Sequence, residues 1–193
     1  MNISAYSKII ILGNNGSGKS WLAKRLAAAT GLPLIHLDAH FWRPNWEMPT
    51  HEEWREKNLE FIAGAQWIID GMCSHGGTME LRFAAADLAI ILDVNRFTCL
   101  LGIIKRLGKP RPETAIWAYE KFDWKTISCC KGVLTRPYRL KRIYLDLHAR
   151  YPDTAYWVVK GRRGMRRMVR DTQKRALGIK TSSSGGSRGW RTG

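Results

Sequence analysis

The chain has 193 residues, of which 45% are hydrophobic and 25% are charged, the proportions of an ordinary globular domain. None of its apolar runs reaches the ~20 residues that a helix needs to cross a bilayer, which argues against an integral membrane protein. The net charge of +16 is uneven, because residues 1–95 carry 8 basic and 10 acidic side chains while residues 96–193 carry 24 and 6. This asymmetry favours a polyanionic partner for the second half. The charge by itself does not distinguish among nucleotide phosphates, a nucleic acid and an acidic membrane.

Short β-rich runs alternate with longer amphipathic runs, which predicts strands separated by helices. In chain order we expect a strand at 8–12, a helix at 18–30, a strand at 33–38, a helix at 50–64, a strand at 67–71, a helix at 80–86, a strand at 88–94, helices at 97–108 and 138–151, a strand at 155–161 and a helix at 162–178. Strands that are apolar on both faces and alternate with helices predict an α/β fold, with a parallel five-stranded sheet and helices on each side.

The remaining segments define the domain organisation. Residues 109–137 are rich in basic and aromatic side chains, and we expect them to be irregular and partly helical. Residues 1–178 then form a single domain, and residues 179–193, which are rich in serine and glycine, form a disordered basic tail.

The cysteines and the N-terminus indicate the compartment. The four cysteines, Cys73, Cys99, Cys129 and Cys130, lack the C-x-x-C spacing of zinc and redox sites, so we expect reduced thiols. The first apolar segment is about five residues long and runs straight into a glycine-rich loop, so we do not interpret it as a signal peptide. Both observations predict a cytoplasmic protein.

Residues 13–20 match the spacing G-x-x-x-x-G-K-[ST], the P-loop motif that binds nucleotide phosphates. The motif consists of Gly13, Asn14, Asn15, Gly16, Ser17, Gly18, Lys19 and Ser20. Its glycines let successive backbone N–H groups turn inward, and the following helix adds the positive end of its dipole. We expect Lys19 to reach the β- and γ-phosphates and the Ser20 hydroxyl to ligate Mg²⁺. The predicted cofactors are ATP and Mg²⁺.

Three carboxylates follow or end predicted strands. Asp38, Asp70 and Asp93 fall at the ends of strands 33–38, 67–71 and 88–94. The carboxyl ends of parallel strands meet at one edge of the sheet, where active sites of such folds lie. Carboxylate oxygens suit Mg²⁺, and one carboxylate could also orient or deprotonate an acceptor hydroxyl. We therefore expect Asp70 and Asp93, with Ser20, to hold the metal, and Asp38 and Asp70 to act in catalysis, while helix capping is the structural alternative for each carboxylate.

Two further segments carry a family resemblance. The block LPLIHLD-x-x-FW-x-P-x-W covers residues 32–46, and the patterns WIIDG and R-x-x-x-AD-x-x-I-x-LD cover residues 67–71 and 82–93. Together with the P-loop, they resemble the topology modulation (FlaR-type) proteins, relatives of adenylate kinase, over about residues 8–165. The resemblance implies a P-loop NTPase fold of the nucleoside-monophosphate-kinase type, a three-layer sandwich with a small basic lid at about residues 109–137.

The resemblance also implies roles for particular residues. The Asp-Gly pair at the end of the third strand makes Asp70 the aspartate associated with Mg²⁺, and the end of the second strand places Asp38 near the acceptor. The loop after the fifth strand, with Arg162, is implied to lie beside the nucleobase. The sequence departs from the family after Asp-Gly, because His75 stands where the relatives carry a basic residue. His75 could therefore change how the acceptor is handled, or it is a loop residue without such a role.

Phosphoryl transfer needs positive charge against the β- and γ-phosphates. The candidates in the second half are Lys105, Arg106, Arg111, Arg136, Arg139 and Arg142. Of these we single out Arg136 and Arg139 as catalytic phosphate clamps, with Lys19 from the P-loop. Most of the other basic side chains fit a solvated face equally well.

Two functions from different classes fit these features. The first is an ATP-dependent phosphotransferase that moves the γ-phosphoryl group to a small-molecule or nucleotide acceptor. The alternative is a nucleic-acid-associated ATP-binding protein or ATPase that affects DNA topology, since Arg166, Arg167 and Arg170 continue a basic stripe on the last helix. We favour the first function, expect no membrane partner, and leave the acceptor and the oligomeric state open.

Overall fold

A computed structural model describes residues 2–43, 47–109, 124–135 and 137–179 of the chain. At its centre lies a parallel sheet of five strands in the order β2-β3-β1-β4-β5. The strands are β1 (Lys8–Gly13), β2 (Leu34–His36), β3 (Trp67–Asp70), β4 (Leu88–Asp93) and β5 (Ala155–Lys160). The prediction of an α/β fold with a parallel five-stranded sheet is therefore confirmed.

The register of the sheet fixes which residues meet at its carboxyl edge. Ile11 of β1 lies opposite Asp70 of β3, and Gly13 of β1 lies opposite Leu92 of β4. On the far side of β3, Asp70 lies opposite His36 of β2. The ends of β2, β3 and β4 thus converge on the loop that follows β1.

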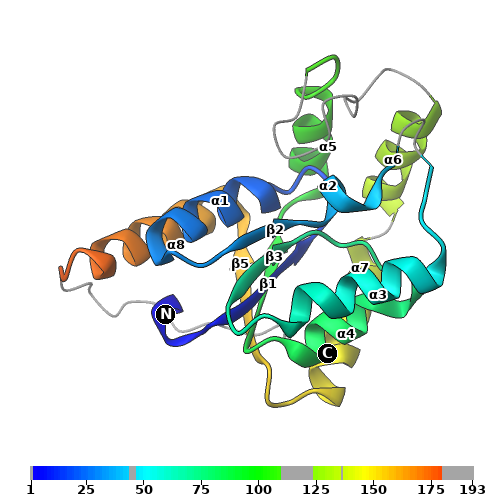
Figure 1. Ribbon diagram of the computed structural model, residues 1–193. Helices are drawn as coiled ribbons and strands as arrows, with labels where there is room; N and C mark the ends of the chain where they lie inside the picture. The colour runs from blue at the N-terminus through cyan, green and yellow to red at the C-terminus, as the bar shows by residue number, and fades with distance from the viewer. Residues whose placement is uncertain (1, 44–46, 110–123, 136, 180–193) are drawn as a thin grey trace.

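Helices cover both faces of the sheet (Figure 1). In chain order the described helices are η1 (Ile3–Ala5), α1 (Lys19–Thr30), α2 (Leu37–Phe41), α3 (His51–Ala63), η3 (His75–Gly77), α4 (Thr78–Ala85), α5 (Arg96–Ile104), α6 (Trp124–Thr135), α7 (Pro137–Arg150) and α8 (Gly161–Ala176). Helices α1 and α8 lie side by side on one face, α3, α4 and α7 lie on the other, and α5 and α6 stand together beyond one end of the sheet.

Alternating side chains of β1 pack into two separate hydrophobic cores, one on each face of the sheet. Ile9 and Ile11 pack with α1 and α8, whereas Ile10 and Leu12 pack with α3, α4 and α7. All four are at most 1% exposed, so β1 is buried on both faces, as a central parallel strand should be. None of the helices in the described ranges is long and apolar enough to cross a membrane.

Helix α3, which corresponds to the helix predicted at 50–64, begins with a capping box. The Thr50 hydroxyl accepts from the Glu53 backbone N–H at 3.2 Å, and the Glu53 carboxylate accepts from the Thr50 N–H at 2.8 Å. These two bonds satisfy groups that a helix start otherwise leaves unpaired. They also lower the pKa of Glu53, because the Thr50 N–H and then Arg43 favour its ionised form.

Two boundary predictions were wrong. The strand predicted at 33–38 ends at His36, because the chain turns into the short helix α2 at Leu37, whose side chain is fully buried. Asp38 therefore lies in the first turn of α2 and does not end a strand. The helix predicted at 97–108 ends at Ile104, and Gly108 follows with a φ of 70°.

The predicted lid and tail are described in part. Within the segment 109–137, which we expected to be partly helical, residues 124–135 form the helix α6. Residues 110–123 and 136 lie outside the described residues. The predicted tail, apart from Ile179, lies outside them as well.

Arg82 of α4 is a buried cation that ties three segments together. It is 1% exposed, and its guanidinium donates to the Asn58 side chain of α3, to Thr78 Oγ1 at 3.1 Å and to the Cys73 carbonyl after β3. Burial lowers the pKa of Arg82 to about 10, so the group stays charged at neutral pH. Arg82 therefore fixes α3 relative to the loop that follows Asp70.

The substitution Arg82→Met tests this role. It removes the donors, leaves the oxygens of Asn58 and Cys73 without this partner, and leaves Thr78 Oγ1 only its bond to the His75 carbonyl. A buried polar group left unpaired costs about 1 to 3 kcal/mol, so we expect the free energy of unfolding in urea to fall by at least ~2 kcal/mol. The exposed Arg55 of α3 gives the control Arg55→Met, which should change it by less than ~0.5 kcal/mol. Equal effects of the two substitutions would contradict a structural role for Arg82.

Candidate nucleotide-binding site

The loop between β1 and α1 has the geometry of an anion cradle. Gly16 and Gly18 have φ values of 75° and 98°, which side chains with a Cβ rarely adopt. Gly18 is the N-cap of α1, and the N–H groups at the N-terminal end of a helix, where Lys19 and Ser20 lie, are suited to an anion. The Lys19 ammonium donates to the carbonyl of Asn14 at 3.2 Å and so folds back over the loop.

Helix α5 presses its backbone directly against this loop. A Cβ added to Gly102 of α5 would lie 2.4 Å from the Gly16 carbonyl oxygen, and a Cβ added to Gly16 would lie 2.0 Å from the Cys99 carbonyl oxygen. Neither glycine has room for a side chain. The thiol of Cys99 is fully buried at this junction, and burial raises its pKa although Lys19 opposes the shift.

Helix α6 also contacts the loop, through two side-chain hydrogen bonds. The Asn14 amide donates to the Val133 carbonyl at 3.0 Å, and the Asn15 amide donates to Cys129 Sγ at 3.1 Å. Val133 packs in a small apolar cluster with Cys99, and Cys129 packs against that cluster. Two predicted phosphate-loop residues thus use their side chains to anchor α6.

A pocket opens beside the loop, between the N-terminal ends of α1 and α8. It has a volume of about 260 Å³ and is lined by Gly18, Trp21, Arg162, Met165 and Arg166. Trp21 supplies an aromatic wall, and a planar base can stack on such a ring. Arg162, which the sequence predicts beside the nucleobase, lies in this pocket.

Asp70 lies at the carboxyl end of β3, next to the strand that leads into the loop. It is 4% exposed, and its Oδ2 atom is 2.9 Å from His36 Nδ1. The other oxygen, Oδ1, is buried and has no hydrogen-bond partner among the described residues. A buried carboxylate oxygen without a partner is costly, and an ion or ordered water is a common explanation.

The other predicted carboxylates occupy different surroundings. Asp38 is half-buried in the first turn of α2, and Asp93 is exposed at the end of β4. In the sheet Asp93 lies opposite Lys160, just before the pocket residue Arg162. Asp38 and Asp93 therefore flank the loop on opposite sides, and Asp70 lies between their strands.

The donor set fits a magnesium ion bound together with a nucleotide. Mg²⁺ prefers oxygen ligands and keeps several waters, so it needs only one or two protein groups. The unpartnered Oδ1 of Asp70 and the hydroxyl of Ser20 at the start of α1 are oxygen donors of this kind. The hydroxyl of Ser17, 1% exposed, is a second buried polar atom of the loop region that has no partner among the described residues.

The two predicted lid arginines are not placed. Arg136 lies outside the described residues, and Arg139 belongs to α7 but its side chain lies outside them as well. Their assignment as phosphate clamps stays a prediction.

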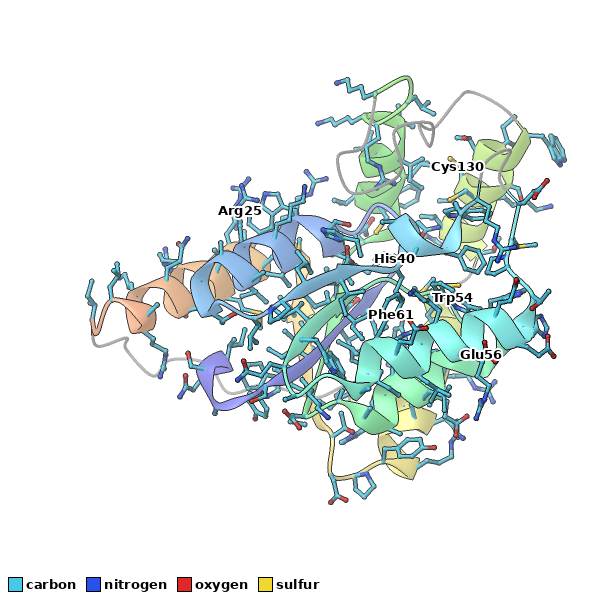
Figure 2. The ribbon with its side chains drawn as sticks, in the orientation of Figure 1. Arg25, His40, Trp54, Glu56, Phe61 and Cys130 are labelled. Atoms are coloured by element: carbon cyan, nitrogen blue, oxygen red, sulfur yellow. The ribbon has the colours of Figure 1, made fainter. Side chains whose placement is uncertain are left out.

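Aromatic side chains after β2 form a packed cluster (Figure 2). Phe41 and Trp54 are 5% and 1% exposed, and their ring centroids are 4.9 Å apart. His40 lies over Phe61 of α3 with a centroid distance of 5.0 Å. His75 is tied to the Pro49 carbonyl at 3.0 Å and touches the edge of Phe41, at 5.5 Å. Phe41 and Trp54 thus belong to the core.

Sequence reasoning missed three groups at this site. His36 was overlooked because the strand predicted at 33–38 was extended two residues too far. With the correct end of the strand, the rule that active sites lie at the carboxyl ends of parallel strands would have indicated His36. Trp21 was correctly assigned to the apolar face of its helix, where it packs against the core, but its place in the wall of the pocket was missed. The close approach of Gly102 to Gly16 joins segments far apart in the chain, and periodicity carries no signal for it.

The chain has the fold of the small P-loop kinases. No protein-family model matches the chain, and no curated protein matches it. Among solved structures, a shikimate kinase from Bacteroides thetaiotaomicron is similar with a TM-score of 0.52 at 14% identity, covering 90% of this chain and 99% of that chain.

Two further structures show the same likeness. A gluconokinase from Sinorhizobium meliloti 1021 has a TM-score of 0.51 at 14% identity, covering 89% of this chain and 91% of that chain. The shikimate kinase from Acinetobacter baumannii, in complex with shikimate, has a TM-score of 0.52 at 14% identity, covering 91% and 95%. At this identity the likeness establishes the fold, which agrees with the predicted P-loop fold of nucleoside-monophosphate-kinase type.

The contact between α5 and the loop makes a testable prediction. Gly→Ala substitutions inside helices usually stabilise a protein by up to about 1 kcal/mol. Gly102→Ala should instead weaken ATP binding by roughly tenfold or more, because the new Cβ displaces the Gly16 carbonyl and distorts the cradle. Isothermal titration calorimetry measures the affinity, and Leu101→Ala, at a side chain that is 55% exposed, is the control. Unchanged affinity in Gly102→Ala would contradict the contact.

Proposed function

We propose that the protein is an ATP-dependent phosphotransferase that moves the γ-phosphoryl group of ATP to a small-molecule or nucleotide acceptor. The observation that carries the proposal is the juxtaposition, at one sheet edge, of a glycine cradle closed by Lys19, a base-sized pocket and a buried carboxylate at Asp70. Each feature would bind one part of a nucleotide, and together they would place the terminal phosphate at the carboxyl ends of β2 and β3.

The phosphates would bind to the backbone N–H groups of the loop and to the start of α1. On binding, the Lys19 ammonium would exchange the Asn14 carbonyl for phosphate oxygens, which its flexible side chain allows. The base would enter the pocket between Trp21 and Arg162. Mg²⁺, held through Ser20 and Asp70 with Asp93 nearby, would neutralise the charge that develops on the transferred group.

The acceptor would approach from the ends of β2 and β3. Asp38, at the start of α2, is the carboxylate best placed to orient an acceptor hydroxyl. Arg136 and Arg139 are the proposed clamps on the phosphates. Phosphoryl transfer depends mainly on positive charge that stabilises the transition state, and it needs little covalent chemistry from the protein. The resemblance to FlaR-type topology modulation proteins belongs to this proposal and names no acceptor.

The first test removes the ammonium of the loop. Lys19→Ala should lower Mg-ATP affinity at least tenfold and abolish ADP formation, because no other side chain of the loop carries positive charge. Purified wild-type protein would be screened against nucleoside monophosphates, shikimate, gluconate and uncharged polyols, with ADP formation as the readout. Lys24→Ala on the same helix is the control. If no acceptor raises ADP formation above the Lys19→Ala background, the phosphotransferase proposal fails.

A second candidate function rests on the surface of α8. Its exposed basic side chains are Arg162, Arg163, Arg166, Arg167, Arg170 and Lys174. The helix contains one acidic residue, Asp171, which lies 3.9 Å from Arg170. The apolar side of α8 is buried against the sheet, so no apolar face is left to enter a bilayer. Such a surface fits the phosphate backbone of a nucleic acid, with the nucleotide site as a switch.

Charge reversal away from the pocket tests this candidate. The double substitution Arg163→Glu/Arg167→Glu should weaken DNA and RNA binding. It should also make the slope of log affinity against log salt concentration shallower, by the equivalent of about two released counterions. Arg55→Glu/Lys57→Glu on α3 changes the net charge equally and is the control. Binding that both variants lose alike, or that vanishes at physiological salt, would leave non-specific electrostatics alone and exclude this candidate.

A further inference from the structure

His36 and Asp70 form a side-chain pair at the edge of the sheet where the nucleotide phosphates are proposed to bind. The two residues are register partners on neighbouring parallel strands, and His36 Nδ1 lies 2.9 Å from Asp70 Oδ2. The side chains are 16% and 5% exposed. Two strands and nearly complete burial of the carboxylate therefore hold the pair in place.

The direction of this hydrogen bond is set by chemistry. A carboxylate can only accept, so the hydrogen must lie on His36 Nδ1, and this holds for both the neutral and the charged imidazole. Asp70 Oδ2 is thus occupied by a donor from the protein, whereas Oδ1 is buried and has no partner among the described residues. The histidine determines which oxygen of Asp70 remains for a ligand.

We infer that His36 is a positioning residue for the metal site: it holds Asp70 so that Oδ1 receives a water of the Mg²⁺ that accompanies ATP. This inference rests on the proposed function, because it needs a metal–nucleotide complex in the loop. A residue that orients a metal-binding group through a hydrogen bond, without contacting the metal, typically contributes about 10- to 100-fold to metal affinity or activity. His36 would do so without touching the metal or the nucleotide.

The pair could also be a purely structural contact, and the two roles differ in one measurable quantity. A structural contact affects ATP binding equally with and without metal. A positioning role affects the gain in ATP affinity that Mg²⁺ provides, defined as the dissociation constant in EDTA divided by that in excess Mg²⁺. The test compares this ratio between variants.

Titration calorimetry with ATP would be performed on wild type, His36→Phe, His36→Asn and Asp70→Asn, each with excess Mg²⁺ and with EDTA. We expect His36→Phe to lower the ratio about tenfold, toward the value of Asp70→Asn, with little change in EDTA. His36→Asn should retain most of the ratio, because its amide places an N–H near the position of Nδ1. His148→Phe, at a half-buried ring that stacks on Tyr156, is the matched control.

The outcomes separate the inference from the proposed function. A wild-type ratio retained in His36→Phe, or a loss of affinity that is equal with and without Mg²⁺, overturns the positioning role and leaves the phosphotransferase proposal intact. Absence of ATP binding by wild type under both conditions overturns the proposed function and the inference with it.

A measurement on the unaltered protein guards against misfolded variants. Nitrogen-15 NMR of the His36 ring should show hydrogen on Nδ1 with and without Mg-ATP. A ring that carries hydrogen on Nε2 alone would overturn the inference.

Discussion

The central position of β1 is the constraint on which the rest of the structure depends. Because β1 lies between β3 and β4 and is buried on both faces, the chain that leaves it at Gly13 emerges among the carboxyl ends of its neighbours. A loop there can reach helix α1 only by turning sharply, and the positive φ angles of Gly16 and Gly18 provide that turn. The same register places Asp70 beside the loop.

The surroundings of the loop explain how a flexible sequence forms a fixed cradle. Glycine loses more conformational freedom on folding than any other residue, so a loop with three glycines needs external support. That support comes from the backbone of α5 at Gly102, and from α6, which accepts hydrogen bonds from Asn14 and Asn15. Helices α5 and α6 are thus coupled directly to the loop. The pocket at Trp21 and the buried pair of His36 and Asp70 complete the proposed site.

Local signals in the sequence were enough to predict the class of fold and the phosphate loop. The order of apolar runs predicted the parallel sheet, and the spacing of Gly13 to Ser20 predicted the loop. The features that were missed arise from contacts between distant segments. The pairing of His36 with Asp70 depends on the register of two strands, and a boundary error of two residues concealed it. For the same reason, the burial of Arg82 could not be read from its neighbours in sequence.

The central claim is that one sheet edge holds a complete Mg-ATP site. A crystal structure of the protein with Mg²⁺ and a non-hydrolysable ATP analogue tests it most directly. The account predicts phosphates on the N–H groups of Gly16 to Ser20, the base between Trp21 and Arg162, and a metal-bound water within hydrogen-bond distance of Asp70 Oδ1. Phosphates bound away from this loop, or a base bound outside the pocket between α1 and α8, would contradict it.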